Sequence, residues 1–256
     1  MNHFKRAVVL ALTAAILLLT CAACDQEDEQ PAPPTEKQVW LVSTYVNHAE
    51  QNKGTYYYNE YGNEIRNENY HMNGEFRAIW YTEYDRNQNV IQRSVDSGNS
   101  EPFVQLINTY DEHGNLVKVE QFWSGAGATY IYRYDSQNRC VAKLSNGKLI
   151  ETYIYAEDGS YRVQPEGYPD EYTLYDANGR RLATYRKNQL ESEYVYNQDG
   201  VLIEIKYDTY SYVYELDQNG NAVKEYEEYE SGYQLLVREC TYELYTVKIL
   251  PGEGSN

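Results

Sequence analysis

The chain has 256 residues, of which 30 are tyrosine, four are phenylalanine and four are cysteine. Its formal net charge is −17. This charge argues against nucleic acid as a partner and against docking onto anionic lipid, because both need a basic surface. The length allows one sizeable all-β domain or one repeat array.

The N-terminal segment is typical of a secretion signal. Lys5 and Arg6 precede an apolar run over residues 7–20, which is short for a membrane-spanning helix. We take residues 1–23 as a lipoprotein signal peptide. Its removal takes Lys5 and Arg6 away and changes the net charge from −17 to −19.

The cleavage site is predicted from the sequence TCAAC at residues 20–24. It resembles a bacterial lipobox, in which a peptidase cuts before a cysteine that carries the lipid. Cys24 follows Ala23, as the motif requires, although Cys21 stands where leucine is usual. Cys21 is the alternative lipid site, but Thr20 precedes it. The other alternative is an ordinary signal peptide that releases a free secreted protein.

The segment after the predicted cleavage site indicates a tether. Residues 24–38 are acidic, contain three prolines and show no apolar periodicity, so they cannot bury enough surface to fold. We expect a lipid-attached disordered tether over 24–38, a β-repeat domain over 39–250 and a disordered tail over 251–256. The protein is expected outside the cytoplasm, anchored by lipid to the bacterial cell membrane.

A motif recurs about every 20 residues through the domain. Its clearest copy is YDANGRRL at residues 175–182, with a tyrosine, an aspartate, a glycine and then an apolar residue. With the glycine as reference, there are eight copies, separated by 26, 26, 24, 21, 20, 21 and 20 residues. The reference residues are Gly62, Gln88, Gly114, Asn138, Gly159, Gly179, Gly200 and Gly220.

Each copy predicts a β-hairpin. Glycine, or asparagine in its place, suits a backbone position with positive φ, and the aspartate can accept a hydrogen bond from the backbone two residues on. A second kind of turn lies between the copies, for example at Asn73-Gly74 and Asn146-Gly147. We therefore expect an all-β antiparallel meander of roughly sixteen strands, built from about eight hairpins and open and twisted, or curled.

One copy departs from the pattern. Arg162 stands three residues after Gly159, where the other copies have isoleucine, valine or leucine. The sequence QPEGYPDE follows at residues 164–171. Its two prolines and its glycine predict an irregular connection at this place.

The high tyrosine content predicts a sheet face that is apolar at the rings and wet at the hydroxyls, because a dry core would favour phenylalanine and aliphatic residues. Runs such as TYIYRYD and SEYVYNQ place alternate tyrosines on one face of a strand. Such a face can stack on sugar rings or contact a peptide, or it can serve only cross-strand packing. The candidate ligand contacts are Tyr132, Tyr134, Tyr153, Tyr155, Tyr194, Tyr196, Tyr212 and Tyr214.

The repeats at residues 108–117, 132–141 and 172–182 resemble the YD repeat of Rhs-type bacterial surface and toxin proteins. The resemblance covers most of residues 56–223. It implies hairpins joined into a long spiralling sheet, which in large members of the family encloses a toxin cargo. This chain is too short for such a shell, so the resemblance implies the sheet and an extracellular setting without toxin delivery. The period is also similar to that of the aromatic repeats of cell-wall-binding modules.

No catalytic residue, metal site or cofactor is expected. His48, His71 and His113 lack ligand spacing, the turns lack the further oxygen ligands of a calcium loop, and no nucleophile or phosphate-loop motif occurs. Cys140 and Cys240 are a possible disulfide outside the cytoplasm, or alternatively small buried hydrophobic residues.

The sequence thus predicts a non-catalytic cell-surface lipoprotein whose β-repeat domain serves as a binding or scaffold module. Its expected partners are the membrane, through the lipid, and either cell-wall polysaccharide or another surface protein. The alternative is a carbohydrate- or cell-wall-binding protein that uses the tyrosine-rich face. A hydrolase is the less favoured third interpretation.

Overall fold

The computed structural model describes residues 35–98, 101–123 and 126–250, which form eighteen β-strands. The predicted signal peptide, Cys24, most of the tether and the tail lie outside the described residues. The strands are β1 (Thr35–Asn47), β2 (Asn52–Tyr58), β3 (Glu64–His71), β4 (Phe76–Tyr84), β5 (Val90–Asp96), β6 (Phe103–Tyr110), β7 (Leu116–Trp123), β8 (Ala126–Tyr134), β9 (Cys140–Ser145), β10 (Lys148–Tyr155), β11 (Tyr161–Pro165), β12 (Tyr172–Tyr175), β13 (Arg181–Arg186), β14 (Gln189–Tyr196), β15 (Leu202–Lys206), β16 (Tyr210–Leu216), β17 (Ala222–Tyr229) and β18 (Gln234–Ile249).

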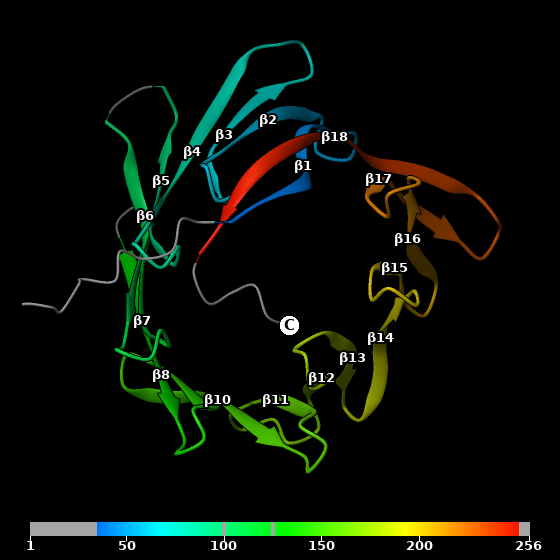
Figure 1. Cartoon of the computed structure of the whole chain (residues 1–256). Coiled ribbons are helices and arrows are strands. Elements are labelled where there is room, and N and C mark those ends of the chain that lie inside the picture. Colours follow the sequence, from blue (N-terminus) through cyan, green and yellow to red (C-terminus); the bar gives the residue numbers. More distant parts are fainter. Residues whose placement is uncertain (1–34, 99–100, 124–125, 251–256) are drawn as a thin grey trace, which may run out of the picture. The chain divides into compact units, whose positions relative to one another are not determined.

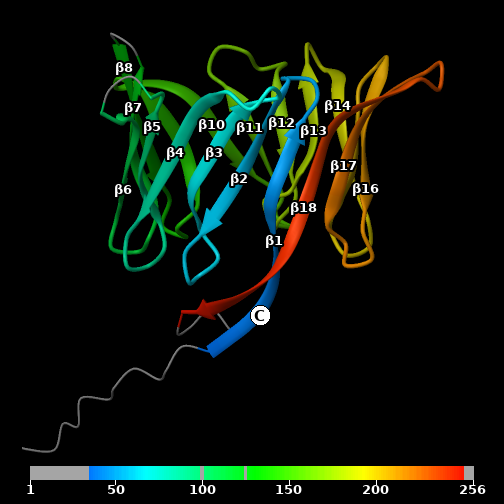
Figure 2. The same cartoon turned by 90° about the horizontal axis from the view of Figure 1, so that it is seen from above.

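Within the compact unit Gln38–Val247, the strands form a closed ring (Figure 1). Each strand pairs antiparallel with the next one along the chain, from β1–β2 to β17–β18. The first and last strands, β1 and β18, also pair with each other. Figure 2 shows the strands side by side, with their turns gathered at two opposite ends.

The antiparallel all-β meander is as expected, but the prediction of an open sheet of roughly sixteen strands is wrong. The eight repeats form β2 to β17, and the two further strands, β1 and β18, flank the array without containing a repeat turn. At the seam, the His48 backbone N–H donates a hydrogen bond to the Val237 carbonyl (2.8 Å) and Ser43 Oγ donates one to the Thr241 carbonyl (3.2 Å). Closure pairs the backbone groups that two free sheet edges would leave exposed.

Seven of the eight repeat turns share one hydrogen-bonding pattern with Asp or Asn as the first residue, whereas the fifth has Ala156 there and keeps only the backbone bonds, such as that from Gly159 (3.2 Å). In the second repeat, the Gln88 N–H donates to the Asp85 carbonyl (3.1 Å), and Asp85 Oδ1 accepts from the N–H groups of Asn87 (2.9 Å) and Asn89 (2.8 Å). All eight reference positions have positive φ, including Gln88 and Asn138 at 64°. The turn aspartate therefore satisfies backbone donors that the hairpin geometry leaves without a strand partner.

Seven of the eight repeat hairpins contain a β-bulge after the turn. The bulged residue is the apolar one three positions after the reference residue, because the cross-strand register skips it. In the second repeat, for example, Tyr84 pairs with Val90 and Glu83 with Gln92, so that Ile91 has no partner. A bulge bends a strand and increases its twist, and its repetition gives the sheet the regular curvature that a ring requires.

A tyrosine clasp links neighbouring hairpins. The tyrosine four residues before a reference residue donates its hydroxyl hydrogen to a backbone carbonyl of the preceding hairpin, two residues after that hairpin's reference residue. Tyr84 reaches the Glu64 carbonyl at 2.7 Å, and Tyr110 reaches the Val90 carbonyl at 2.9 Å. The further clasps are Tyr134 to Leu116, Tyr155 to Cys140, Tyr196 to Arg181 and, at the two ends of the array, Tyr58 to Val42 and Tyr242 to Ala222.

In the part of the chain that the structure describes, the sheet has no packed second layer. Among the described residues, four apolar side chains are buried, namely Val119, Leu144, Ala183 and Val247, and most strand residues on both faces are half-buried. A ring of eighteen strands spaced about 4.8 Å apart would be roughly 27 Å in diameter. Side chains cannot fill the interior of a ring of that width. Turn hydrogen bonds, clasps and cross-strand contacts therefore stabilise this fold in place of a large core.

The turn aspartates predict a loss of stability in acid. Hydrogen bonds from the Asn115 and Asn221 side chains lower the pKa of Asp111 and Asp217, and those from Arg139 lower the pKa of Asp135. Because each folded-state pKa lies below the unfolded value of about 3.9, this stabilisation is present above about pH 4 and is lost as the pH falls through the folded-state values. The temperature of the thermal unfolding midpoint should therefore decrease as the pH is lowered through that acid range.

The matching variant changes the three turn aspartates to asparagine. At neutral pH, this variant should unfold at a lower temperature than the wild type, as measured by circular dichroism. In acid, the unfolding temperatures of the two proteins should become similar. The control removes three negative charges from repeat turns through Glu112→Gln, Glu157→Gln and Asp199→Asn, and it should keep the full acid dependence. Equal acid dependence in all three proteins would contradict the prediction.

Candidate functional site

The candidate site lies at the repeat that breaks the pattern. The β10–β11 hairpin has no bulge, so that Tyr155 pairs with Tyr161 and Ile154 with Arg162 in continuous register. Without the bulge, each residue of β11 points to the same face of the sheet as its partner in β10. Tyr153, for example, pairs with Val163. The two strands that follow the turn are short, β11 with five residues and β12 with four.

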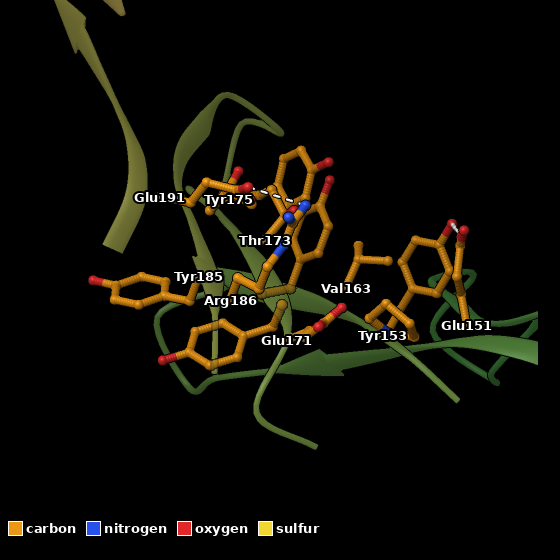
Figure 3. Close-up of a pocket in the computed structure, with 13 residues that line it drawn as sticks. Glu151, Tyr153, Val163, Glu171, Thr173, Tyr175, Tyr185, Arg186 and Glu191 are labelled. Atoms are coloured by element: carbon orange, nitrogen blue, oxygen red, sulfur yellow. Dashed lines mark hydrogen bonds and ion pairs between the residues drawn. The ribbon is translucent and has the colours of Figure 1, made fainter. Parts of the chain in front are cut away.

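A cleft of about 470 Å³ opens over β10 to β14 (Figure 3). The predicted irregular connection contributes Pro165 and Glu171 to its lining. There Gly167 has φ 83°, the Tyr168 N–H donates to the Pro165 carbonyl, and the Glu171 N–H donates to the Tyr168 carbonyl. The lining residues are Glu151, Tyr153, Tyr161, Val163, Pro165, Glu171, Tyr172, Thr173, Tyr175, Thr184, Tyr185, Arg186 and Glu191.

Three half-buried tyrosines form an aromatic strip across the cleft. The Tyr161 ring stacks on Tyr175 with centroids 4.8 Å apart and planes 6° apart, and its centroid lies 6.4 Å from that of Tyr153. Figure 3 shows Val163 and the Glu171 carboxylate between the Tyr153 and Tyr175 side chains. Such a strip presents flat apolar faces next to hydroxyl groups.

The clasp is absent at this point, which leaves the Tyr175 hydroxyl free. In the described structure Tyr175 makes no hydrogen bond to the preceding hairpin and stacks on Tyr161 instead. Burial raises the pKa of Tyr153 and of Tyr161. Both hydroxyls therefore stay protonated at neutral pH. The Tyr153 hydroxyl donates to Glu151 Oε2 at 3.5 Å, whereas that of Tyr161 can donate a hydrogen bond to a ligand.

Acidic side chains surround the strip. Glu151 pairs with the Lys143 Nζ atom at 3.4 Å, and Glu191 pairs with Arg186 at 3.0 Å. Glu171 has no ion-pair partner among the residues that the structure describes. The cleft therefore combines aromatic faces with one carboxylate whose charge is not neutralised.

The sequence-predicted ligand tyrosines are distributed around the ring, and Tyr153 lines the cleft. Three of the others have a structural role, because Tyr134, Tyr155 and Tyr196 belong to the clasp. The remaining four contact neighbours on the sheet, Tyr132 with Lys143, Tyr194 with Arg181, Tyr212 with Tyr210 and Tyr214 with Glu225. Sequence reasoning missed Tyr161, Tyr175 and Glu171, although the irregular Arg162 repeat indicated their position.

Other chemistry-bearing groups stand apart from the cleft. Cys140 and Cys240 are both free thiols, and burial raises the pKa of each. His48 pairs with Glu239 at 3.0 Å across the seam. In the described ranges, no group of three or more His, Cys, Asp or Glu side chains is placed to hold a metal ion. The same residues contain no helix that is long and apolar enough to cross a membrane.

Comparisons with known proteins give distant structural similarity. No family model matches the sequence, and no curated protein matches it. Similar solved structures include TcdB2-TccC3 without the hypervariable C-terminal region (TM-score 0.37, 14% identity, 78% of this chain and 14% of that chain). Two others are TcdB2-TccC3 (TM-score 0.36, 15% identity, 75% and 14%) and TcdB2-TccC3-Cdc42 (TM-score 0.31, 10% identity, 70% and 14%). The chain thus spans 14% of the length of these chains.

Proposed function

We propose that this protein is a non-catalytic, lipid-anchored binding module that holds a polysaccharide outside the cytoplasm. Its YD-like hairpins supply the scaffold, Cys24 carries the lipid and residues 25–38 join the lipid to the domain. The first strand, β1, begins at Thr35, so the last residues of this linker enter the sheet.

The aromatic strip Tyr153–Tyr161–Tyr175 is the observation that carries the proposal. Sugar rings have apolar C–H faces and polar rims, and flat tyrosine rings with neighbouring carboxylates complement both. The closed sheet favours a sugar over a peptide strand, because a ring has no free edge to which an extended peptide could pair. Two of the three cleft carboxylates are engaged by cations, which favours binding over hydrolysis, since a glycosidase needs two carboxyl groups free to act.

The test is retention of residues 25–256, the mature chain without its lipid-carrying cysteine, on insoluble cell wall and on a panel of polysaccharides. We expect saturable binding that falls about tenfold or more when Tyr153→Leu and Tyr175→Leu are combined, because each stacked ring contributes about 1 kcal/mol. The control pair, Tyr210→Leu with Tyr212→Leu, removes two tyrosines outside the cleft and should bind as the wild type does.

Thermal unfolding of both double variants shows whether they remain folded. Retention that is equal in both variants would place the binding surface elsewhere on the sheet. No retention on any polysaccharide would contradict the proposal and favour another surface protein as the partner.

A further inference from the structure

Seven tyrosine rings of the described chain lie under a cation of the chain itself, and of these only Tyr172 lines the cleft. The Lys143 Nζ atom lies 5.0 Å from the centroid of the Tyr130 ring and 3.4 Å from Glu151 Oε1. Arg139 lies over Tyr155 at 4.6 Å. The same arrangement recurs with Arg180 over Tyr196, Arg181 over Tyr194, Arg162 over Tyr172 and Arg66 over Tyr57.

The aromatic strip in the cleft has no such cation. Within the described part of the chain, no Lys or Arg lies over the rings of Tyr153, Tyr161 or Tyr175. Glu171, which lines the same cleft, has no ion-pair partner there either. The faces of aromatic rings attract cations, and the attraction increases when a carboxylate is close. The strip and Glu171 are therefore the kinds of group that hold Lys143 beside Tyr130 and Glu151, but no cation of the described chain is engaged with them. The cations in or beside the cleft have other partners, Arg186 with Glu191 and Arg162 with Tyr172.

We propose that the cleft is specific for a polysaccharide with unsubstituted, protonated amino groups, and that Glu171 and the aromatic strip bind the ammonium group. This inference rests on the proposed function, since it names the class of polysaccharide that the same cleft takes. In the cleft, the ammonium group lies between a tyrosine ring and the Glu171 carboxylate, as the Lys143 ammonium group lies beside Tyr130 and Glu151 elsewhere on the sheet. The sugar ring covers the tyrosine faces. The net charge of −17 adds a long-range attraction for a cationic polymer.

The experiment compares two soluble oligomers of the same length, one of glucosamine and one of N-acetylglucosamine. They share the ring and differ in the charge of the amino group. Binding to the mature chain is measured by titration calorimetry at a pH at which the free amines are protonated. We expect the glucosamine oligomer to bind about tenfold more tightly, the range of one cation–π contact with a carboxylate partner.

The variant Glu171→Gln should remove this preference and leave the binding of the N-acetylated oligomer unchanged. Its matched control is Glu166→Gln, which removes the same charge from an exposed position in the same connection and should keep the preference. This pair separates the cleft from general attraction to an acidic protein. A preference that survives in Glu171→Gln would overturn the inference.

The remaining outcomes separate the two proposals. Equal binding of both oligomers would overturn the inference and leave polysaccharide binding in place. Binding of neither oligomer, with no retention on polysaccharides, would overturn both. A lysine-rich peptide that displaces the glucosamine oligomer and binds more tightly, in a Glu171-dependent manner, would assign the ammonium site to a basic protein partner and overturn the polysaccharide assignment.

Discussion

A chain that ends after Tyr229, and therefore lacks β18, will not form a stable monomeric domain. β18 pairs with β17 through five residue pairs from Lys224↔Glu239 to Glu228↔Gln234, and it also pairs with β1. Its removal leaves two long unpaired edges on a sheet with few buried apolar side chains. Exposed edges of this kind pair with other chains. Light scattering coupled to size-exclusion chromatography should show oligomers or aggregate.

The control for this truncation ends after residue 250 and keeps all of β18. It should elute as the full-length mature chain does and unfold at the same temperature. A truncated chain without β18 that stays monomeric, with the thermal midpoint of the full-length chain, would show that the seam contributes little to stability.

Loss of the tyrosine clasp is expected to lower stability substantially. The combined change of Tyr84, Tyr110 and Tyr134 to phenylalanine keeps the rings and removes three hydroxyl-to-carbonyl hydrogen bonds of 2.7, 2.9 and 3.0 Å. Each lost bond costs about 1 kcal/mol, and the carbonyls of Glu64 and Leu116 lose their tyrosine partner, whereas the Val90 carbonyl keeps the Asn108 Nδ2 donor at 2.8 Å. The three sites lie in different repeats, so their effects should add to about 3 kcal/mol and lower the thermal midpoint by roughly 6–12 °C.

The matched control changes Tyr81, Tyr130 and Tyr212 to phenylalanine. These hydroxyls make no hydrogen bond within the described part of the chain, so the thermal midpoint should move by only a degree or two. Denaturant unfolding followed by tyrosine fluorescence and by circular dichroism would measure both sets. Equal losses in the two triple variants would show that the clasp hydrogen bonds do not stabilise the fold.

The hairpins could be predicted from the sequence because their chemistry is local. The turn from Asp176 to Gly179 contains within a few residues the carboxylate, the backbone donors and the positive-φ position that it needs. The closing strands could not be predicted in this way. Their partners lie far apart in the chain, as with Ser43 and Thr241, and neither strand contains the motif by which strands were counted.

The candidate site was indicated only indirectly. Arg162 replaces the apolar residue that forms the bulge in the other repeats, and its position predicted an irregularity, though not the cleft. Tyr161 and Tyr175 meet because the register of β10, β11 and β12 runs without a bulge between Tyr155 and Tyr161. Which tyrosines belong to the clasp depends on carbonyl groups in the preceding hairpin, which no pattern within a single repeat contains.

The hairpin repeat also means that the circumference of this ring can change only in fixed steps, by the gain or loss of whole repeats. Every repeat contributes two antiparallel strands, so the gain or loss of one repeat returns the chain to the same end of the ring and leaves the seam between β1 and β18 possible. One such step changes the circumference by about 9.6 Å and the diameter by about 3 Å. Relatives that differ by whole repeats would therefore be rings of graded width, each closed by the same pair of terminal strands.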